Sequence, residues 1–351
     1  MDSLTQIVLG ASVGEACGGK KLGNKAALWG AIAGTIPDLD VFINAYNDPI
    51  HGALMHRGFS HSVLFAALAG PILGYLIYRI YRRKHELTTW LWVAFMAIIT
   101  HPILDIFTSY GTQFFWPFEW RVSLNSIFVI DPLYTLPFGF LLLASLMIKK
   151  NVSLRRKLNN AGLVYSGLYL TWCVLVKLII LSNTPNYFKD YDIDHSKTVV
   201  NALPFTSFYW MIITESNASN YIGYKSIFYP FNKNEVDTLT KNHSLLAEIE
   251  SKNKEWVQTI QFMTKNCYSV TKRDDSLEVY DLKFGLTSPF TSPKITIPVR
   301  GYGLVIDSGI VNKTYITRPK FIWSKVKFGG YINKIFEDDE SPAPTSNSSN
   351  H

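Results

Sequence analysis

Long apolar runs fill the first half of the chain and stop near residue 182. Four of them, at about 60–81, 89–107, 127–148 and 161–181, reach the ~20 residues that an α-helix needs to cross a bilayer. A fifth run, 26–44, is interrupted by Pro37, Asp38 and Asp40, so we expect it to enter the membrane and break there. The pattern predicts an α-helical polytopic membrane domain over residues 1–182.

From residue 183 the pattern changes to short alternating segments rich in β-branched and aromatic residues, which is typical of strands. We expect strands at 199–203, 208–214, 218–228, 277–284 and 302–306, and one or two amphipathic helices at 234–264. This half is therefore predicted to be a smaller α+β domain over 183–340. The Ser/Pro/Asn-rich tail, 341–351, cannot bury a core, and we expect it to be disordered.

The charge of the chain carries information on topology. Its net charge of +7 comes from two basic clusters beside apolar runs: Arg79, Arg82, Arg83 and Lys84, then Lys149, Lys150, Arg155, Arg156 and Lys157. Lys and Arg collect on the cytoplasmic side of membrane proteins, so the helices should alternate and leave everything after residue 183 extracytoplasmic. The expected partner is the lipid bilayer, and no nucleic acid is expected.

Three short segments then place ionisable groups beside these apolar runs, where they are costly and indicate function. His101 and Asp105 are four residues apart, on one face of a predicted helix. His56 and His61 suit a turn followed by a helix start, with Ser60 as the N-cap. The predicted topology brings all three segments to the outer side of the membrane. The candidate metal ligands are Asp38, Asp40, His56, His61, His101 and Asp105.

Imidazole and carboxylate groups without a thiolate suit zinc above all, with manganese or non-haem iron as alternatives. Six ligands exceed the needs of one tetrahedral zinc, so two ions, or one ion with supporting carboxylates, both remain open. A bound metal lowers the pKa of its water toward ~7 and makes hydroxide available for hydrolysis. The candidate catalytic residues are Asp38, Asp105 and Arg57; Arg57 either holds a substrate phosphate or carboxylate or snorkels to the interface.

Several other residues have competing interpretations. We expect Asp2, Ser3 or Thr5 to cap a first helix. Glu15 in that helix either reaches the interface or a lysine, or supports the metal site together with Gln6. Asp131 is either the cap of a helix or a member of the site. We expect structural or solvated roles for His85, His195 and His243, and no disulfide framework from Cys17, Cys173 and Cys267.

Taken together, the motifs carry a family resemblance over about residues 1–150. PDLD at 37–40, HRGFSHS at 56–62, THPILDIFTSYG at 100–111 and FFWPF at 114–118 resemble the LexA-regulated, inner-membrane-associated metal-dependent hydrolase family. The resemblance implies a bacterial inner-membrane protein and a hydrolase, with the six candidate ligands in the motif positions of the family. The chain departs from the pattern at Gln6, where members often carry a histidine.

The sequence thus predicts a membrane-embedded hydrolase that acts by metal-activated water at the outer face of the membrane, on a lipid or phosphoester of the envelope. The alternatives are a metal-ion transporter and an intramembrane protein that binds metal only for folding. Transport favours ligands distributed along the membrane normal. Catalysis favours one cluster with an open coordination position.

Overall fold

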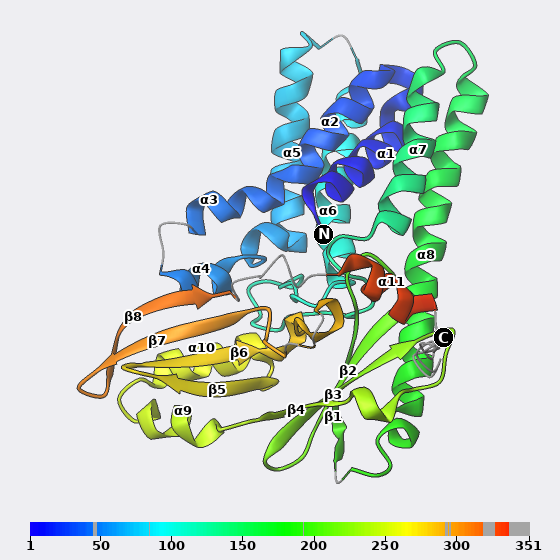
Figure 1. Ribbon diagram of the computed structural model, residues 1–351. Coiled ribbons are helices and arrows are strands. Elements are labelled where there is room, and N and C mark those ends of the chain that lie inside the picture. The colour runs from blue at the N-terminus through cyan, green and yellow to red at the C-terminus, as the bar shows by residue number, and fades with distance from the viewer. Residues whose placement is uncertain are drawn as a thin grey trace, which may run out of the picture.

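The protein is described by a computed structural model that covers residues 1–336 except 45–47, 84, 192, 292–293, 295 and 319–326. Helices form the N-terminal half and antiparallel sheets form most of the C-terminal half (Figure 1). The predicted order of a helical half and an α+β half is confirmed. The predicted disordered tail and the basic residue Lys84 lie outside the described residues.

The N-terminal half consists of helices joined by short turns, apart from the longer non-helical segment 107–131. They are α1 (Ser3–Leu22), α2 (Asn24–Thr35), η1 (Ile36–Leu39), α3 (Asp40–Asn44), α4 (Pro49–Met55), η2 (Phe59–His61), α5 (Val63–Ile80), α6 (Leu87–Ile106), α7 (Pro132–Met147) and α8 (Val152–Tyr187). Among the described residues, α5, α6 and α8 are long and apolar enough to cross a membrane, and α7 is a shorter apolar helix.

The start of α7 explains why this helix is shorter than the apolar run that predicts it. Asp131 is its N-cap, and the Asp131 carboxylate accepts a hydrogen bond from the Tyr134 backbone nitrogen at 3.1 Å. Residues 127–130 therefore precede the helix. Asp2 caps α1 in the same way by accepting from the Thr5 nitrogen at 3.0 Å. Both predicted caps are confirmed.

Helices α1 and α2 pack with their backbones in close approach. A Cβ atom added at Gly14 would lie 2.3 Å from the Ala26 carbonyl oxygen, and one added at Gly30 would lie 2.2 Å from the Gly10 oxygen. Only glycine tolerates such an approach without displacing the neighbouring helix. The pairing matters for the site, because η1 follows directly after α2.

The C-terminal half contains two four-stranded antiparallel sheets in the orders β1-β2-β3-β4 and β5-β6-β7-β8. The strands are β1 (Asp194–Ala202), β2 (Tyr209–Glu215), β3 (Ser219–Ser226), β4 (Asp237–Thr240), β5 (Tyr268–Arg273), β6 (Ser276–Asp281), β7 (Gly301–Asp307) and β8 (Ile310–Thr317). Short turns η3 (Lys233–Glu235), η4 (Leu282–Phe284) and η5 (Ser288–Phe290) and helices α9 (His243–Glu250), α10 (Lys254–Thr264) and α11 (Phe328–Phe336) complete it.

The prediction missed β4, β5 and β8, and it extended the helices of this half back to residue 234. All three strands are sheet edges. An edge strand has one side open to solvent and needs fewer apolar residues, so its sequence signal is weak. Residues 233–240 form η3 and β4 before α9 begins.

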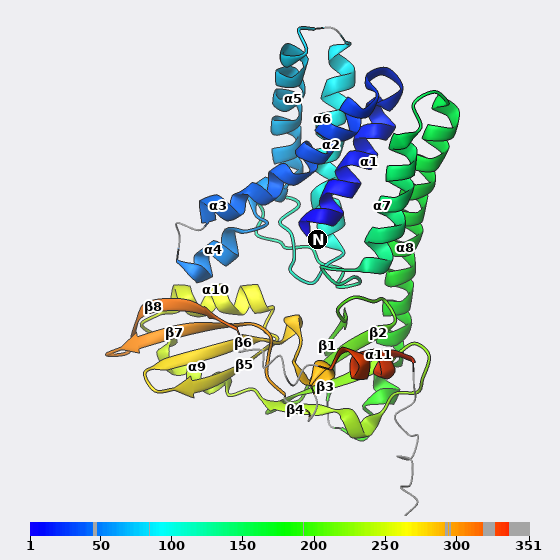
Figure 2. The ribbon, with the colours of Figure 1, turned by 45° about the horizontal axis from the view of Figure 1, so that its top comes forward.

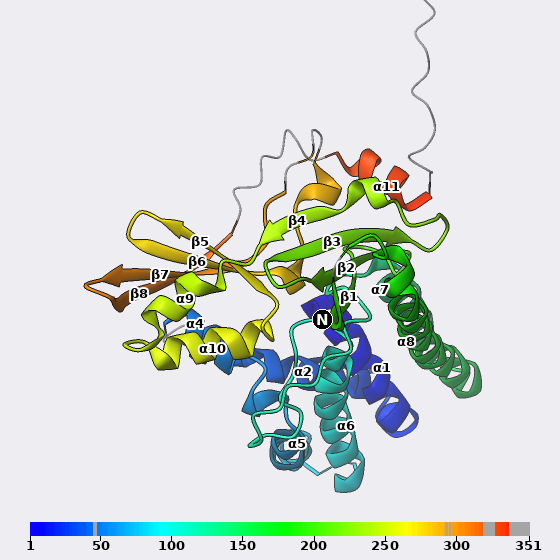
Figure 3. The ribbon, with the colours of Figure 1, turned by 90° about the horizontal axis from the view of Figure 1, so that it is seen from below.

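The sheet half lies across one end of the helices (Figures 1 and 2). Ile50 and Ala53 of α4 share a core with Val257 and Ile260 of α10, and α4 contacts both α10 and β8 of the second sheet. Figure 2 shows α4 above these two elements. Helix α8 continues to Tyr187, past residue 182, and its last turns pack on the first sheet, which Figure 3 shows from below. Contacts through α4 on one side and α8 on the other thus hold the sheet half against the helical half.

Candidate metal centre

Four of the six predicted ligands converge at the end of the helices that faces the sheet half. Asp38, His61, His101 and Asp105 each offer one ligand atom, and these atoms all lie within 4.8 Å of one another. Asp38 comes from η1, His61 from η2, and the other two from the last turns of α6. His61, His101 and Asp105 are fully buried, and the Asp38 side chain is 28% exposed.

Local structure explains this convergence. His101 and Asp105 are one helical turn apart on α6, with 3.7 Å between His101 Nε2 and Asp105 Oδ2. Pro37 cannot donate to an α-helical ladder, so α2 ends at Thr35 and the chain continues as η1. This change of geometry places Asp38 Oδ1 at 3.4 Å from the Nε2 atoms of both histidines.

Hydrogen bonds fix the orientation of both imidazole rings. His101 Nδ1 donates to the Gly34 carbonyl oxygen at 2.6 Å. His61 Nδ1 lies 2.9 Å from Ser60 Oγ, which itself donates to Asp40 Oδ2 at 2.8 Å, so the His61 nitrogen is the donor to Ser60. Each ring therefore carries its proton on Nδ1 and directs the lone pair of Nε2 into the cluster.

The resulting arrangement fits a cation. The two Nε2 atoms are 3.1 Å apart, and with both protons on Nδ1 neither can donate to the other. Asp105 Oδ2 is buried without a hydrogen bond, forms an ion pair with Arg57 Nε at 3.0 Å and lies 3.5 Å from His61 Nε2. Buried electron-pair donors that face one another repel unless a positive charge lies between them. Two nitrogen and two oxygen donors match zinc, with manganese or iron as alternatives.

Asp40 and His56, also predicted as ligands, lie beside this group and outside it. Asp40 accepts hydrogen bonds from His56 Nδ1 at 2.8 Å, from the Arg57 backbone nitrogen at 3.1 Å and from Ser60 Oγ at 2.8 Å. Its Oδ2 atom also lies 3.5 Å from His61 Nδ1. The Asp40 carboxylate thus lies behind His61 and orients it. The four grouped atoms could hold one ion, with Asp40 as a supporting carboxylate.

Ser60 was predicted as the N-cap of the following helix, and this prediction is wrong. Ser62 caps α5 and accepts from the Phe65 nitrogen at 3.0 Å. Ser60 lies inside the turn η2, within the motif and before the helix begins, so its hydroxyl connects Asp40 with His61.

Arg57 is buried next to the cluster, with 5% of the residue exposed, so it does not snorkel to an interface. Its Nε lies 3.0 Å from Asp105 Oδ2, and its Nη1 donates to Thr108 Oγ1 at 2.7 Å. The residue adopts a left-handed backbone with φ of 62°, which is uncommon for arginine and often accompanies functional sites. The guanidinium thus places a fixed positive charge beside the four ligands.

Two further groups contact Asp105 Oδ1. Gln6 Nε2 donates to this oxygen at 3.1 Å, as one of the two interpretations of Gln6 and Glu15 expects. The contact of the Met1 amino group with the same oxygen was not foreseen from the sequence. Glu15, the other residue considered with Gln6, is not near the cluster and pairs with Arg155 of α8.

The remaining candidates have structural roles or lie elsewhere. The carboxylate of Asp131 caps α7 and accepts from Tyr169. His243 stacks on Tyr268 in the sheet half, and the side chain of His195 is outside the described part of the structure. The three cysteines are all free.

The N-terminal half, which contains all six predicted ligands, matches a known protein family. Residues 1–180 match the YdjM inner membrane protein family. The chain belongs to this family. It is 31% identical to YfhP of Bacillus subtilis over 140 residues, which is 38% of this chain and 42% of YfhP. It is 27% identical to the inner membrane protein YbcI of Escherichia coli over 145 residues, or 39% of this chain and 82% of YbcI.

No solved structure matches the chain. The family and YbcI support the prediction of an inner-membrane protein. The LexA regulation and the hydrolase activity that the motifs imply stay predictions.

Proposed function

We propose that this protein is a membrane-embedded, metal-dependent hydrolase whose divalent ion, zinc first among the candidates, is held by Asp38, His61, His101 and Asp105. The observation that supports it is the convergence of two imidazole nitrogens and two carboxylate oxygens within 4.8 Å. A metal bound there would lower the pKa of a coordinated water and supply a hydroxide nucleophile.

The residues around the ligands fit such a reaction. Asp38 is the least buried of the four, so substrate and water approach from its side, and its carboxylate is placed to accept a proton from the attacking water. Arg57 supplies a fixed cation 3.0 Å from Asp105 that suits a substrate phosphate or carboxylate. The substrate class that we propose is a lipid or phosphoester of the cell envelope.

We place this site at the outer face of the membrane and the sheet half outside the cytoplasm. The basic residues Arg82 and Arg83 lie in the turn between α5 and α6, and Lys149 and Lys150 lie in the turn between α7 and α8. Both turns are at the end of the helices away from the sheet half (Figure 1). Basic turns favour the cytoplasmic side, which supports this orientation.

The same ligands would serve a metal-ion transporter or a protein that binds metal for folding alone. A transport path requires ligands spread along the membrane normal, whereas these four atoms form one compact group at one end of α6. The compactness and the partial exposure of Asp38 favour a catalytic site.

Metal analysis of the detergent-purified protein, followed by a hydrolysis screen over phospholipids and phosphoesters, tests the proposal. His101→Ala should lose both bound metal and activity. The matched control His85→Ala, in the turn at the opposite end of the helices, should keep both. Arg57→Gln should keep the metal and raise KM or lower kcat. Metal-dependent ion flux in proteoliposomes without any hydrolysis would replace this proposal with transport.

A further inference from the structure

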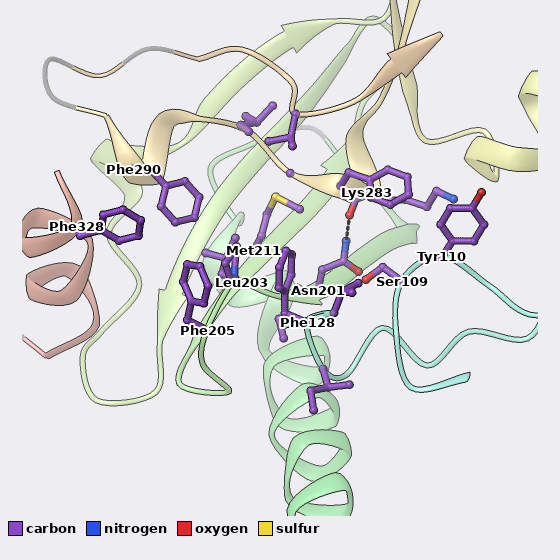
Figure 4. Close-up of a pocket in the computed structure, with 18 residues that line it drawn as sticks. Ser109, Tyr110, Phe128, Asn201, Leu203, Phe205, Met211, Lys283, Phe290 and Phe328 are labelled. Atoms are coloured by element: carbon purple, nitrogen blue, oxygen red, sulfur yellow. Dashed lines mark hydrogen bonds between the residues drawn. The ribbon is translucent and has the colours of Figure 1, made fainter. Parts of the chain in front are cut away.

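A second feature of the molecule is a cavity of ≈ 280 Å³ between the helical half and the sheet half (Figure 4). Its walls come from the segment 109–129 after α6, from β1 and β2, and from residues 283–290 with the start of α11. The volume is close to the lower end, about 300 Å³, of small-molecule sites in proteins. The lining is almost entirely apolar and includes Phe128, Leu203, Met211, Leu286 and Phe290.

One end of the cavity lies next to the apolar surface of the helices. Phe205 and Phe328 stand at this end (Figure 4) and are 39% and 52% exposed. The Phe205 backbone nitrogen donates to the Ile130 oxygen at 3.2 Å, and Ile130 and Leu133 at the start of α7 are also exposed. If α7 and α8 cross the membrane, this end of the cavity opens beside apolar residues at the membrane interface.

The other end of the cavity is cationic and adjoins the metal centre. Tyr110 lies at this end (Figure 4), with the Arg57 guanidinium carbon 5.1 Å and the Arg300 carbon 5.3 Å from its ring centroid. Arg57 also contacts Asp105 of the metal cluster. Burial opposes the charge of the Arg300 guanidinium, but Tyr110 and Asp281 lie close enough to raise its pKa. Arg300 Nε is nevertheless buried without a hydrogen-bond partner. Such a donor favours a negatively charged group nearby.

We propose that this cavity binds a hydrocarbon chain of an anionic membrane lipid, with the charged headgroup held at the Arg57 and Arg300 end. The apolar walls fit the chain, because moving a methylene group from water into an apolar cavity is favourable. Moving it from the lipid interior into the cavity exchanges one apolar surrounding for another. The two guanidinium groups select a negative headgroup. The inference that this lipid is the substrate rests on the hydrolase function proposed above. The inference that the lipid binds in the cavity does not depend on that function.

The test uses the full chain in phosphatidylcholine vesicles doped with a phosphatidylglycerol that carries a diazirine on its acyl chain. After photolysis, labelled peptides should include residues 201–205 and 284–290. Val129→Trp fills the cavity and should lower this labelling about tenfold. Phe328→Asp, at an exposed position that tolerates a charge, should also lower it. The control is Val164→Trp, which makes the same change from valine to tryptophan on the exposed face of α8. This variant should be labelled like the wild type.

The headgroup is tested with the same diazirine on phosphatidylcholine. The wild type should prefer the anionic probe, and Arg300→Gln should lose that preference. Equal labelling of both lipids by the wild type overturns the anionic assignment. Unchanged labelling in Val129→Trp and Phe328→Asp, or labelling confined to the outer faces of α5, α7 and α8, overturns the cavity.

Labelling is repeated with chelator and with His101→Ala, where no hydrolysis can occur. Labelling that persists there supports the lipid site even if the screen finds no hydrolase activity, and then only the function proposed above fails. Lipid hydrolysis that is unaffected by Val129→Trp leaves the hydrolase standing and contradicts the cavity as its substrate site.

Discussion

At the scale of single residues, the carboxylates of Asp105 and Asp40 contact different groups. Asp105 Oδ1 contacts the Met1 amino group and Gln6, whereas Asp105 Oδ2 faces His61 and Arg57. Asp40 faces the Nδ1 atoms of His56 and His61. The Asp105 carboxylate therefore faces the proposed metal position, and the Asp40 carboxylate holds His61, one of the proposed ligands.

This difference leads to a prediction for Asp40→Asn. The amide is a weaker acceptor than the carboxylate, so His61 should be oriented less firmly and zinc affinity should fall about 10–100-fold. Competitive titration with a zinc chelator measures it. Asp48→Asn is the control, because Asp48 contacts His51 and Thr314 and none of the four cluster residues. Zinc affinity equal to that of the wild type would show that Asp40 does not support the ligand.

At the scale of elements, the position of Asp38 depends on how α2 packs. Gly30→Ala introduces a Cβ 2.2 Å from the Gly10 oxygen, so α2 must move and carry η1 with it. We expect a loss of about 1–3 kcal/mol of stability, as for other overpacked sites, and reduced metal content. Thermal unfolding in detergent and metal analysis measure these effects.

The matched control for this prediction is Gly167→Ala. Gly167 lies in α8 with no atom within 4 Å of an added Cβ. Alanine should be neutral or stabilise the helix by up to about 1 kcal/mol. Equal stability and metal content in the two variants would disprove the packing argument.

The ion pair between Glu15 of α1 and Arg155 of α8 joins two other elements. Both side chains are buried. Arg155→Met leaves an unpaired buried carboxylate and should cost about 3–5 kcal/mol of stability. The double variant Glu15→Gln/Arg155→Met should recover part of the loss. The exposed neighbour Arg156 provides the control Arg156→Met, and the thermal midpoint in detergent is the measurement. A double variant no more stable than Arg155→Met would show that charge burial is not the cause.

At the scale of the whole molecule, the proposed orientation predicts opposite accessibility for the two ends of the helices. In a Cys17→Ser background, a cysteine at Glu86 should react with an impermeant maleimide only after the cells are opened. A cysteine at Lys272, an exposed position on β5, should react with the same maleimide while the inner membrane is still intact. Reaction of both positions from one side would refute the orientation.

The sequence by itself determined the local features of this protein. Apolar run length predicted α5, α6 and α8, residue chemistry predicted the caps Asp2 and Asp131, and the four-residue spacing placed His101 and Asp105 on one face of α6. These features depend on neighbours within a few turns, so periodicity and residue type are sufficient to find them.

The tertiary structure decided which distant groups meet. The approach of Asp38 and His61 to α6, the burial of Arg57, the pairing of Glu15 with Arg155, and the cavity between the two halves depend on helix packing and on the docking of the sheets. Sequence spacing carries no information on these contacts, because they join segments whose separation along the chain is unrelated to their distance in space. The packing of α2 and η2 against α6 therefore brought four of the six candidate ligands together.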